Sequence, residues 1–145
     1  MPAVNWHLTL GFYGDLDEPA TRLTQLTTEL AGVEAPRLRL ASAGKFGAVR
    51  WVGVVAEPAA ALRTLAVCAG ADPDTFTPHV TLSRRRGGGA GPLFAALDGY
   101  AGPWRRPAEV TLLASESTDA GSVYTRVGGV ALRGRDGRPD SLTKF

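Results

Sequence analysis

The stretch HLTL at residues 7–10 is nearly repeated as HVTL at residues 79–82, and the two histidines of the chain, His7 and His79, each open one copy. Both copies lie in runs rich in β-formers, which predict strands. Because successive residues of a strand point to opposite faces, each copy places its histidine and its threonine on one face and its apolar residues on the other. Each strand is therefore predicted to present an imidazole beside a hydroxyl while its other face anchors it in a core.

The repeated pairs are His7 with Thr9 and His79 with Thr81. A histidine in a strand is usually only a polar residue on the exposed face, and threonine is common in strands. Threonine makes up about 9% of the chain, so the chance that both histidines carry threonine two residues later is about 1%. We therefore interpret the two pairs as halves of one site, with ordinary strand composition as the alternative.

The composition is that of a soluble globular chain of 145 residues, with 44% hydrophobic and 21% charged residues and a formal charge of +2; this length favours one domain. Nearly all basic residues are arginines, which suit phosphate, but we favour a genome-wide bias as the explanation. The lone Cys68 excludes an internal disulfide and fits a reducing compartment. With no signal peptide and no apolar run long enough for a membrane, we expect a cytoplasmic protein.

The remaining pattern mixes strands with amphipathic helices, which predicts an α+β fold with an antiparallel or mixed sheet. A strand with the His-x-Thr pattern appears in each half of the chain, so we expect two related lobes that face each other. One domain is expected over 1–133, followed by a polar tail over 134–145. Strands are expected over 5–13, 36–42, 49–56, 75–83, 109–117 and 122–132, helices over 18–32, 58–70 and 92–100, and a glycine-rich loop over 84–91.

Several kinds of catalytic site fit the sequence poorly. Two histidines and one distant cysteine give no zinc-like spacing, so no metal ligands and no cofactor are predicted. No G-x-S-x-G stretch marks a serine nucleophile, and the glycine run near residue 88 lacks the Lys-Ser/Thr of a P-loop. Phosphodiester cleavage fits better: one neutral imidazole takes a proton from water, one imidazolium protonates the leaving oxygen, and threonine hydroxyls donate to the phosphate oxygens.

The two motifs and their flanking residues resemble the signatures of a known family. HLTLGFYGDL (7–16) and FTPHVTLSRRR (76–86) are similar to the two signatures of the two-histidine (2H) phosphoesterases, and above all to the RNA 2′,3′-cyclic phosphodiesterases often named 2′-5′ RNA ligases. The strand VRWVGV (49–54) and the closing hairpin (102–132) extend the resemblance, which covers most of 3–133.

The resemblance implies a bilobal fold with two mostly antiparallel sheets around a central cleft and helices outside. It implies hydrolysis of 2′,3′-cyclic phosphates, on RNA ends or nucleotides, to 2′-phosphates. His7 would then be the proton donor and His79 the proton acceptor, while Thr9 and Thr81 bind the phosphate. A non-catalytic RNA- or nucleotide-binding module, or 2′-5′ RNA ligation at the same site, remain the alternatives.

Other residues are weaker candidates. Arg84 matches a family arginine that contacts phosphate, but in an ideal strand it points away from His79. Either the strand ends or bulges there, or Arg86 takes that role; the alternative is that the arginines of 84–86 only begin a solvated loop. Three aromatic residues are candidates for stacking on a base, with core packing as the alternative: Phe12, Phe46 and Tyr124.

The first motif begins earlier in this chain than in the family, which usually has a strand and a helix before it. We therefore expect a shortened N-terminus and an exposed sheet edge beside the strand of His7. A second copy of the chain could cover that edge as a homodimer.

Overall fold

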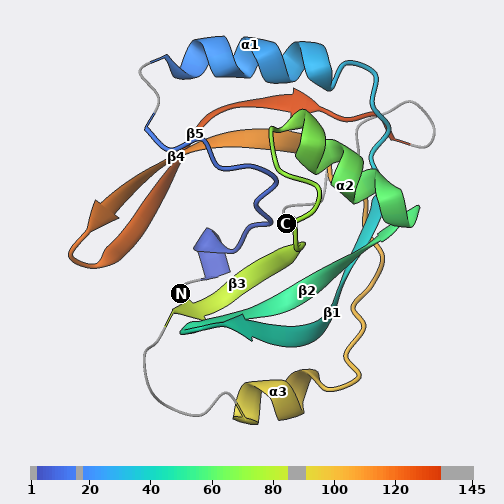
Figure 1. The fold of residues 1–145 in the computed structure, drawn as a ribbon, viewed down its shortest axis with the longest axis vertical. Helices are drawn as coiled ribbons and strands as arrows, with labels where there is room; N and C mark the ends of the chain where they lie inside the picture. The colour runs from blue at the N-terminus through green and yellow to red at the C-terminus, as the bar shows by residue number, and fades with distance from the viewer. Residues whose placement is uncertain (1–2, 16–17, 85–90, 135–145) are drawn as a thin grey trace.

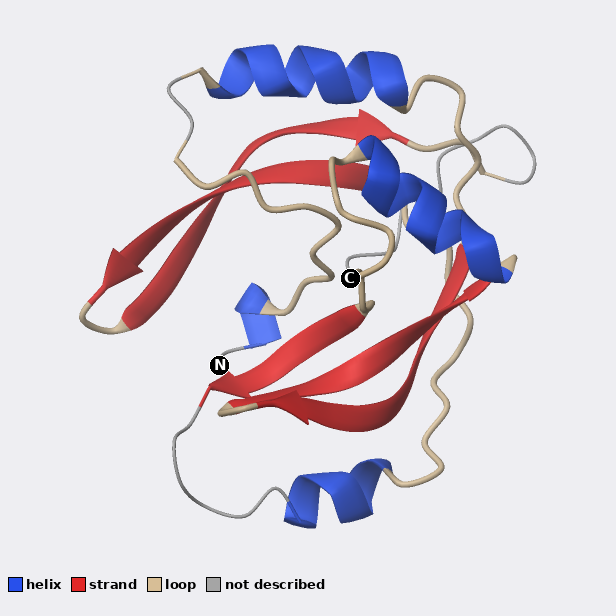
Figure 2. Ribbon diagram, in the orientation of Figure 1, coloured by secondary structure: helices blue, strands red, loops and turns tan. Residues whose placement is uncertain are grey.

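The computed structural model describes residues 3–15, 18–84 and 91–134. Within these ranges the chain folds into two antiparallel sheets and three α-helices (Figures 1 and 2), so the predicted α+β class is confirmed. The described elements are a 3-10 helix η1 (Ala3–Asn5), α1 (Pro19–Glu29), β1 (Arg37–Phe46), β2 (Val49–Glu57), α2 (Ala59–Cys68), β3 (His79–Arg84), α3 (Gly91–Leu97), β4 (Glu109–Thr118) and β5 (Gly121–Ala131).

One sheet has the order β1-β2-β3, and the other is the β4-β5 hairpin. Figure 1 shows the two sheets as separate layers, with α1 above the hairpin and α3 below the three-stranded sheet. Helix α2 connects the two cores, because Leu65 packs in the core between α1 and the hairpin while Leu62 packs against β1–β3. Leu10 contacts both cores, so the N-terminal segment runs through the junction of the lobes.

The helices end where glycine permits a change of backbone direction. Pro19 opens α1, where its missing N–H leaves no hydrogen bond unmade. Gly32 (φ 72°) and Gly70 (φ 88°) follow the ends of α1 and α2. The three expected helices form: α1 and α2 are slightly shorter than expected, and α3 begins one residue earlier than expected and ends three residues earlier. No helix among the described residues is long and apolar enough to span a bilayer.

The strand expected over 5–13 is wrong. Residues 3–5 form the helix η1, and the only ladder contact of the following segment within the described ranges is the antiparallel bridge between Leu8 and Val80. The segment turns away because Gly11 passes tightly over the end of α2: a Cβ on Gly11 would lie 2.3 Å from the carbonyl oxygen of Ala69. Packing against α2 thus overrides the β-propensity of these residues.

The strand expected to start at residue 75 starts at His79 instead. Asp72 forms a turn before it, accepting hydrogen bonds from the backbone N–H of Asp74 on Oδ1 and of Phe76 on its carbonyl. Strand β1 is longer than expected and reaches Phe46, where a two-residue turn leads into β2. The loop expected over 84–91 falls largely on residues 85–90, and the polar tail on 135–145, which lie outside the described residues.

An ion pair fastens the two strands of the β4-β5 hairpin. Arg126 donates to both carboxylate oxygens of Glu109, and this hydrogen bonding holds the pKa of Glu109 below its usual range. A carboxyl with a lowered folded-state pKa stabilises the fold above its unfolded pKa of about 4.3 and loses that contribution as pH falls through the folded value. We therefore expect Glu109→Gln to be slightly less stable than wild type to urea at pH 7, with the gap closing below about pH 4. A gap that persists at low pH would point to lost packing rather than lost charge.

Candidate active site

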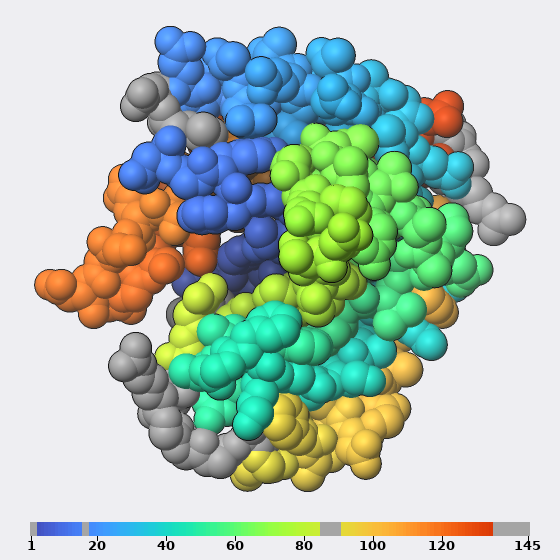
Figure 3. Space-filling view, viewed as in Figure 1, coloured from blue at the N-terminus to red at the C-terminus, as the bar shows by residue number. Residues whose placement is uncertain are grey.

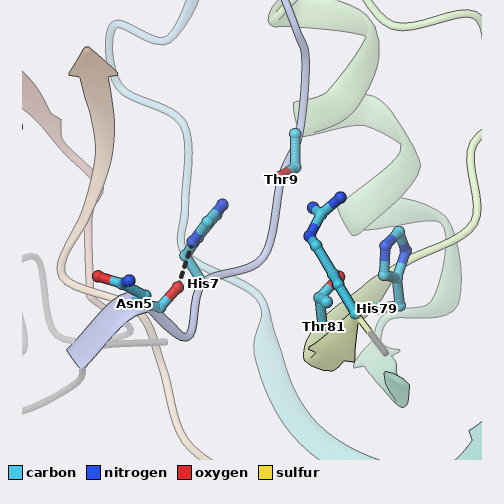
Figure 4. A pocket seen from close by; sticks show the side chains of 6 residues that line it. Asn5, His7, Thr9, His79 and Thr81 are labelled. Carbon is cyan, nitrogen blue, oxygen red and sulfur yellow. Dashed lines mark hydrogen bonds between the residues drawn. The ribbon is translucent and has the colours of Figure 1, made fainter. Parts of the chain in front are cut away.

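Both repeated motifs line one pocket. Its walls come from Asn5, His7 and Thr9 of the N-terminal segment and from His79, Thr81 and Arg84 of β3, and its free volume is about 50 Å³. Figure 4 shows the side chains of the N-terminal segment on one side and those of His79 and Thr81 on the other. In Figure 3 the molecule is hollowed between the projecting hairpin and the lobe of β1–β3, with the N-terminal segment behind.

The bridge between Leu8 and Val80 explains how the motifs meet. Extending this antiparallel register by one residue each way places His7 beside Thr81 and Thr9 beside His79. Leu8 and Val80 both pack in the core of the β1–β3 lobe, so the four polar side chains share the opposite face. The register of this bridge sets each histidine opposite the threonine of the other motif, which gives the pocket an approximate two-fold arrangement.

The two imidazoles are oriented in the same way. Nδ1 of His7 lies 2.6 Å from the carbonyl oxygen of Asn5, and Nδ1 of His79 lies 2.7 Å from that of Thr77. A carbonyl oxygen only accepts, so Nδ1 carries the hydrogen in both rings. Nε2 of each ring is thereby left for chemistry, as a lone pair when neutral or as an N–H when charged.

Arg84 reaches the pocket through a β-bulge. Trp51 of β2 pairs with Thr81, whereas its neighbour Arg50 pairs with Ser83, so Leu82 is an additional residue in β3. This residue reverses the alternation and turns Arg84 to the face of His79. Of the alternatives considered for Arg84, the structure therefore has the bulge. Arg84 lines the pocket and adds a positive charge beside the imidazoles. Arg86 lies outside the described residues.

Two of the three aromatic candidates lie beside the histidines. The ring of Tyr124 is 4.7 Å from that of His7, centroid to centroid, and the ring of Phe46 is 5.3 Å from that of His79. Phe12 is 86% exposed and is not among the residues that line the pocket. The structure thus brings Phe46 and Tyr124 to the site and leaves Phe12 outside it.

Trp51 belongs to the surroundings of His79 but was missed in the sequence. Its ring lies 5.8 Å from the imidazole and 5.1 Å from Phe46. The indole lies over Gly44 on β1, where a Cβ would come within 2.2 Å of it. The signal that could have revealed this is a glycine opposite a tryptophan in a hairpin, where the missing side chain leaves room for the ring.

Asn5 was missed as well. It lines the pocket, its carbonyl orients His7, and its side-chain Nδ2 donates to the carbonyl of Ser122 at 3.2 Å. The hairpin that carries Ser122 also carries Tyr124, so β5 supports His7 through two contacts. Within the described ranges no group of three or more His, Cys, Asp or Glu side chains gathers to hold a metal ion.

One pocket lined by paired His-x-Thr motifs, in a fold with two antiparallel sheets, is typical of the two-histidine phosphoesterases. The sequence matches the 2′-5′ RNA ligase superfamily over residues 1–117. The chain belongs to this superfamily.

Solved structures agree with this assignment. The chain resembles TT0787 of Thermus thermophilus (29% identity, TM-score 0.66), covering 93% of this chain and 82% of that one. It also resembles E. coli LigT complexed with phosphate (26% identity, TM-score 0.63, covering 90% and 77%) and LigT complexed with 3′-AMP (26%, 0.57, covering 91% and 78%). A search of curated proteins gives no match.

Proposed function

We propose that the protein hydrolyses 2′,3′-cyclic phosphates, at RNA ends or on cyclic nucleotides, to 2′-phosphates. The observation that carries this proposal is one pocket lined by both His-x-Thr motifs, with each histidine held through Nδ1 by the carbonyl two residues before it. Such a pocket offers two equivalent Nε2 atoms to a single phosphate, which suits a reaction with one proton taken and one proton given.

In the proposed reaction His79 removes a proton from water, and the water oxygen attacks phosphorus. The bond from phosphorus to the 3′ oxygen breaks, and His7 protonates that oxygen, leaving a 3′-hydroxyl and a 2′-phosphate. Thr9, Thr81 and Arg84 donate to the non-bridging oxygens, whose charge must be stabilised in the transition state. Both proton transfers use imidazoles, so the proposal needs no metal.

Nucleotides as substrates are supported by the relatives and by the aromatic residues of the site. LigT structures are described as complexes with ATP and with 3′-AMP. Phe46 and Tyr124 flank the two histidines, and Phe46 is 47% exposed. We propose both as stacking partners for a base, whereas the exposed Phe12 outside the pocket has no such support.

Phosphorus NMR of a metal-free reaction tests the proposal. Incubation with cytidine 2′,3′-cyclic phosphate in EDTA is expected to give cytidine 2′-phosphate and no 3′ isomer. Binding without turnover would favour the non-catalytic module, and joining of a cyclic-phosphate RNA end to a 5′-hydroxyl end would favour ligation. Turnover that EDTA abolishes would contradict the two-histidine mechanism.

Replacing the phosphate-binding hydroxyls gives a second test. Thr81→Val keeps the β-branched shape but removes the donor to a charged oxygen, an interaction worth about 1.5–3 kcal/mol. We expect kcat/KM to fall about 10- to 100-fold, with a similar fall for Thr9→Val because the site is approximately symmetric. Thr111→Val on β4 is the matched control and should leave kcat/KM unchanged. An unaltered kcat/KM in both site variants would remove the threonines from the proposed mechanism.

A cytoplasmic location is also proposed, on the ground of the single cysteine, Cys68. Fractionation of the source cells followed by immunoblotting tests it. Recovery of the protein outside the cytoplasm would contradict it.

We further propose that a second copy covers a sheet edge beside the N-terminal segment that carries His7. Among the described residues this segment makes one strand contact, the bridge from Leu8 to Val80, so no second strand of the described residues pairs with it. Light scattering over a range of concentrations is expected to give the mass of two chains. The mass of one chain at every concentration would exclude the homodimer.

A further inference from the structure

The face of the β1–β3 sheet that carries His79 continues beyond the pocket. His79 pairs with Gly53, and Gly53 pairs with Ala41 of β1. Gly53 has no side chain, and a Cβ there would lie 2.7 Å from the carbonyl oxygen of Ala41. A row with almost no side chains therefore crosses the sheet from His79 to β1.

This row is bordered by two different walls. On one side stand Trp51 and Phe46, which contact His79. On the other side Val55 pairs with Arg39, and Val55 is 42% exposed. The neighbours of Arg39 on β1, Leu38 and Leu40, pack in the core, so Arg39 faces the same side of the sheet as His79. The row thus begins at the imidazole of His79 and leads, between apolar side chains, toward the guanidinium of Arg39.

Trp104 holds Arg39 in place. The guanidinium carbon lies 4.6 Å from the centre of the indole ring. The segment of Trp104 is fixed along the edge of β1, where Leu38 and Arg105 exchange two backbone hydrogen bonds. Arg37 also contacts Trp104, but Arg37 is paired with Glu57. Arg39 forms no ion pair with any described residue, and its buried Nε has no hydrogen-bond partner there.

A cation fixed in one orientation, with no acidic partner among the described residues, is suited to an anion from outside. A purely structural role would explain why Arg39 stacks on Trp104. It would not explain why Arg39 has no acidic partner among the described residues. From strand spacing and rise, the Cα atoms of His79 and Arg39 are about 12 Å apart. A phosphate in the pocket and a second phosphate at Arg39 would therefore be separated by a short length of extended polynucleotide.

We propose that Arg39, held by Trp104, binds a backbone phosphate upstream of the cyclic phosphate, so that the protein selects the 3′ ends of single-stranded RNA over mononucleotides. The inference rests on the proposed function, because the cyclic phosphate in the pocket sets the direction of the strand. The first nucleoside lies over Gly53 and Ala41 beside Trp51, and the strand continues toward the edge of β1. Aromatic side chains beside a basic groove are the usual means of binding single strands without reading sequence.

The test compares two substrates in one set of variants. We expect Arg39→Gln to lower kcat/KM about tenfold for a pentanucleotide RNA ending in a 2′,3′-cyclic phosphate and to leave cytidine 2′,3′-cyclic phosphate within about twofold of wild type, because only the longer substrate reaches Arg39. Arg39→Gln should also bind a fluorescent pentanucleotide ending in a 2′-phosphate more weakly, as measured by fluorescence anisotropy over a range of salt concentrations. The slope of the logarithm of the binding constant against the logarithm of the salt concentration should become smaller in magnitude by about 0.7. Arg39→Lys should keep the slope, because it keeps the charge.

Arg105→Gln is the matched control. Arg105 is an exposed neighbour of Trp104 but is paired with the buried Leu38, so it belongs to the other face of the sheet. Equal losses in the Arg39 and Arg105 variants, or equal losses for both substrates in Arg39→Gln, would overturn the inference. If neither substrate is hydrolysed while pentanucleotide binding still depends on Arg39, the proposed hydrolysis fails and the upstream phosphate site stands.

Discussion

Replacing His79 or His7 by alanine is expected to lower kcat for cytidine 2′,3′-cyclic phosphate by about 10² to 10⁴-fold each. Each substitution removes one of the two Nε2 atoms that the Asn5 and Thr77 carbonyls leave free for the substrate. The double variant is expected to lose less than the product of the two single effects, because the two proton transfers belong to one step. KM should change far less than kcat, since Thr9, Thr81 and Arg84 still bind the phosphate.

The pH–rate profile separates the roles of the two histidines. A base must be unprotonated, so loss of activity at low pH belongs to the acceptor; an acid must be protonated, so loss at high pH belongs to the donor. In His79→Ala the fall at low pH should disappear while the fall at high pH remains, and His7→Ala should show the reverse. Profiles with these assignments exchanged would reverse the proposed roles and leave the mechanism intact.

Loss of folding must be separated from loss of chemistry in these variants. Neither imidazole is fully buried, so the melting temperatures are expected to stay near that of wild type. Free imidazole added to His79→Ala should restore part of the rate, because a soluble base can occupy the space of the missing ring. Full activity in both folded alanine variants would contradict the two-histidine mechanism.

Much of the site could be predicted from the sequence, because strand alternation is a local property. The pair His79 with Thr81 follows from the period of two in β3. His7 and Thr9 line the same pocket from a segment that pairs with β3 only at Leu8 among the described residues. Arg84 shows the limit of that argument, since its direction depends on the additional residue Leu82 in β3. Nothing in the local pattern shows a bulge, which arises from pairing with β2.

The supporting residues could not be predicted, because they act through long-range contacts. Asn5 meets Ser122 across 117 residues of chain, and Trp51 is placed by a glycine on the neighbouring strand. The strand expected over 5–13 fails for the same reason: its residues favour a strand, but the end of α2 determines their path. The composition of residues near Gly11 gives no sign of that contact.

Gly11→Ala is therefore the second substitution that we expect to lower kcat strongly, although residue 11 does not line the pocket. The new Cβ would lie 2.3 Å from the carbonyl oxygen of Ala69 and 3.1 Å from its carbonyl carbon. Both atoms belong to the backbone at the end of α2, so no side-chain rotation relieves the overlap. The segment that carries Thr9 and His7 must move away from α2, and a shift of about 1 Å can cost about 10²-fold in rate. Overpacking should also lower the free energy of unfolding by about 1–3 kcal/mol.

The contact with a backbone oxygen allows a sharp control. Adding Ala69→Gly to Gly11→Ala should not restore kcat, because the overlapping oxygen remains, whereas a contact with the Ala69 side chain would be relieved. Gly91→Ala is the matched control: a Cβ there meets no atom within 4 Å, so kcat should stay at the wild-type value. Measurement of kcat and of urea unfolding on all three variants decides the matter. A Gly11→Ala protein with wild-type kcat would show that the position of the first motif does not depend on its path over α2.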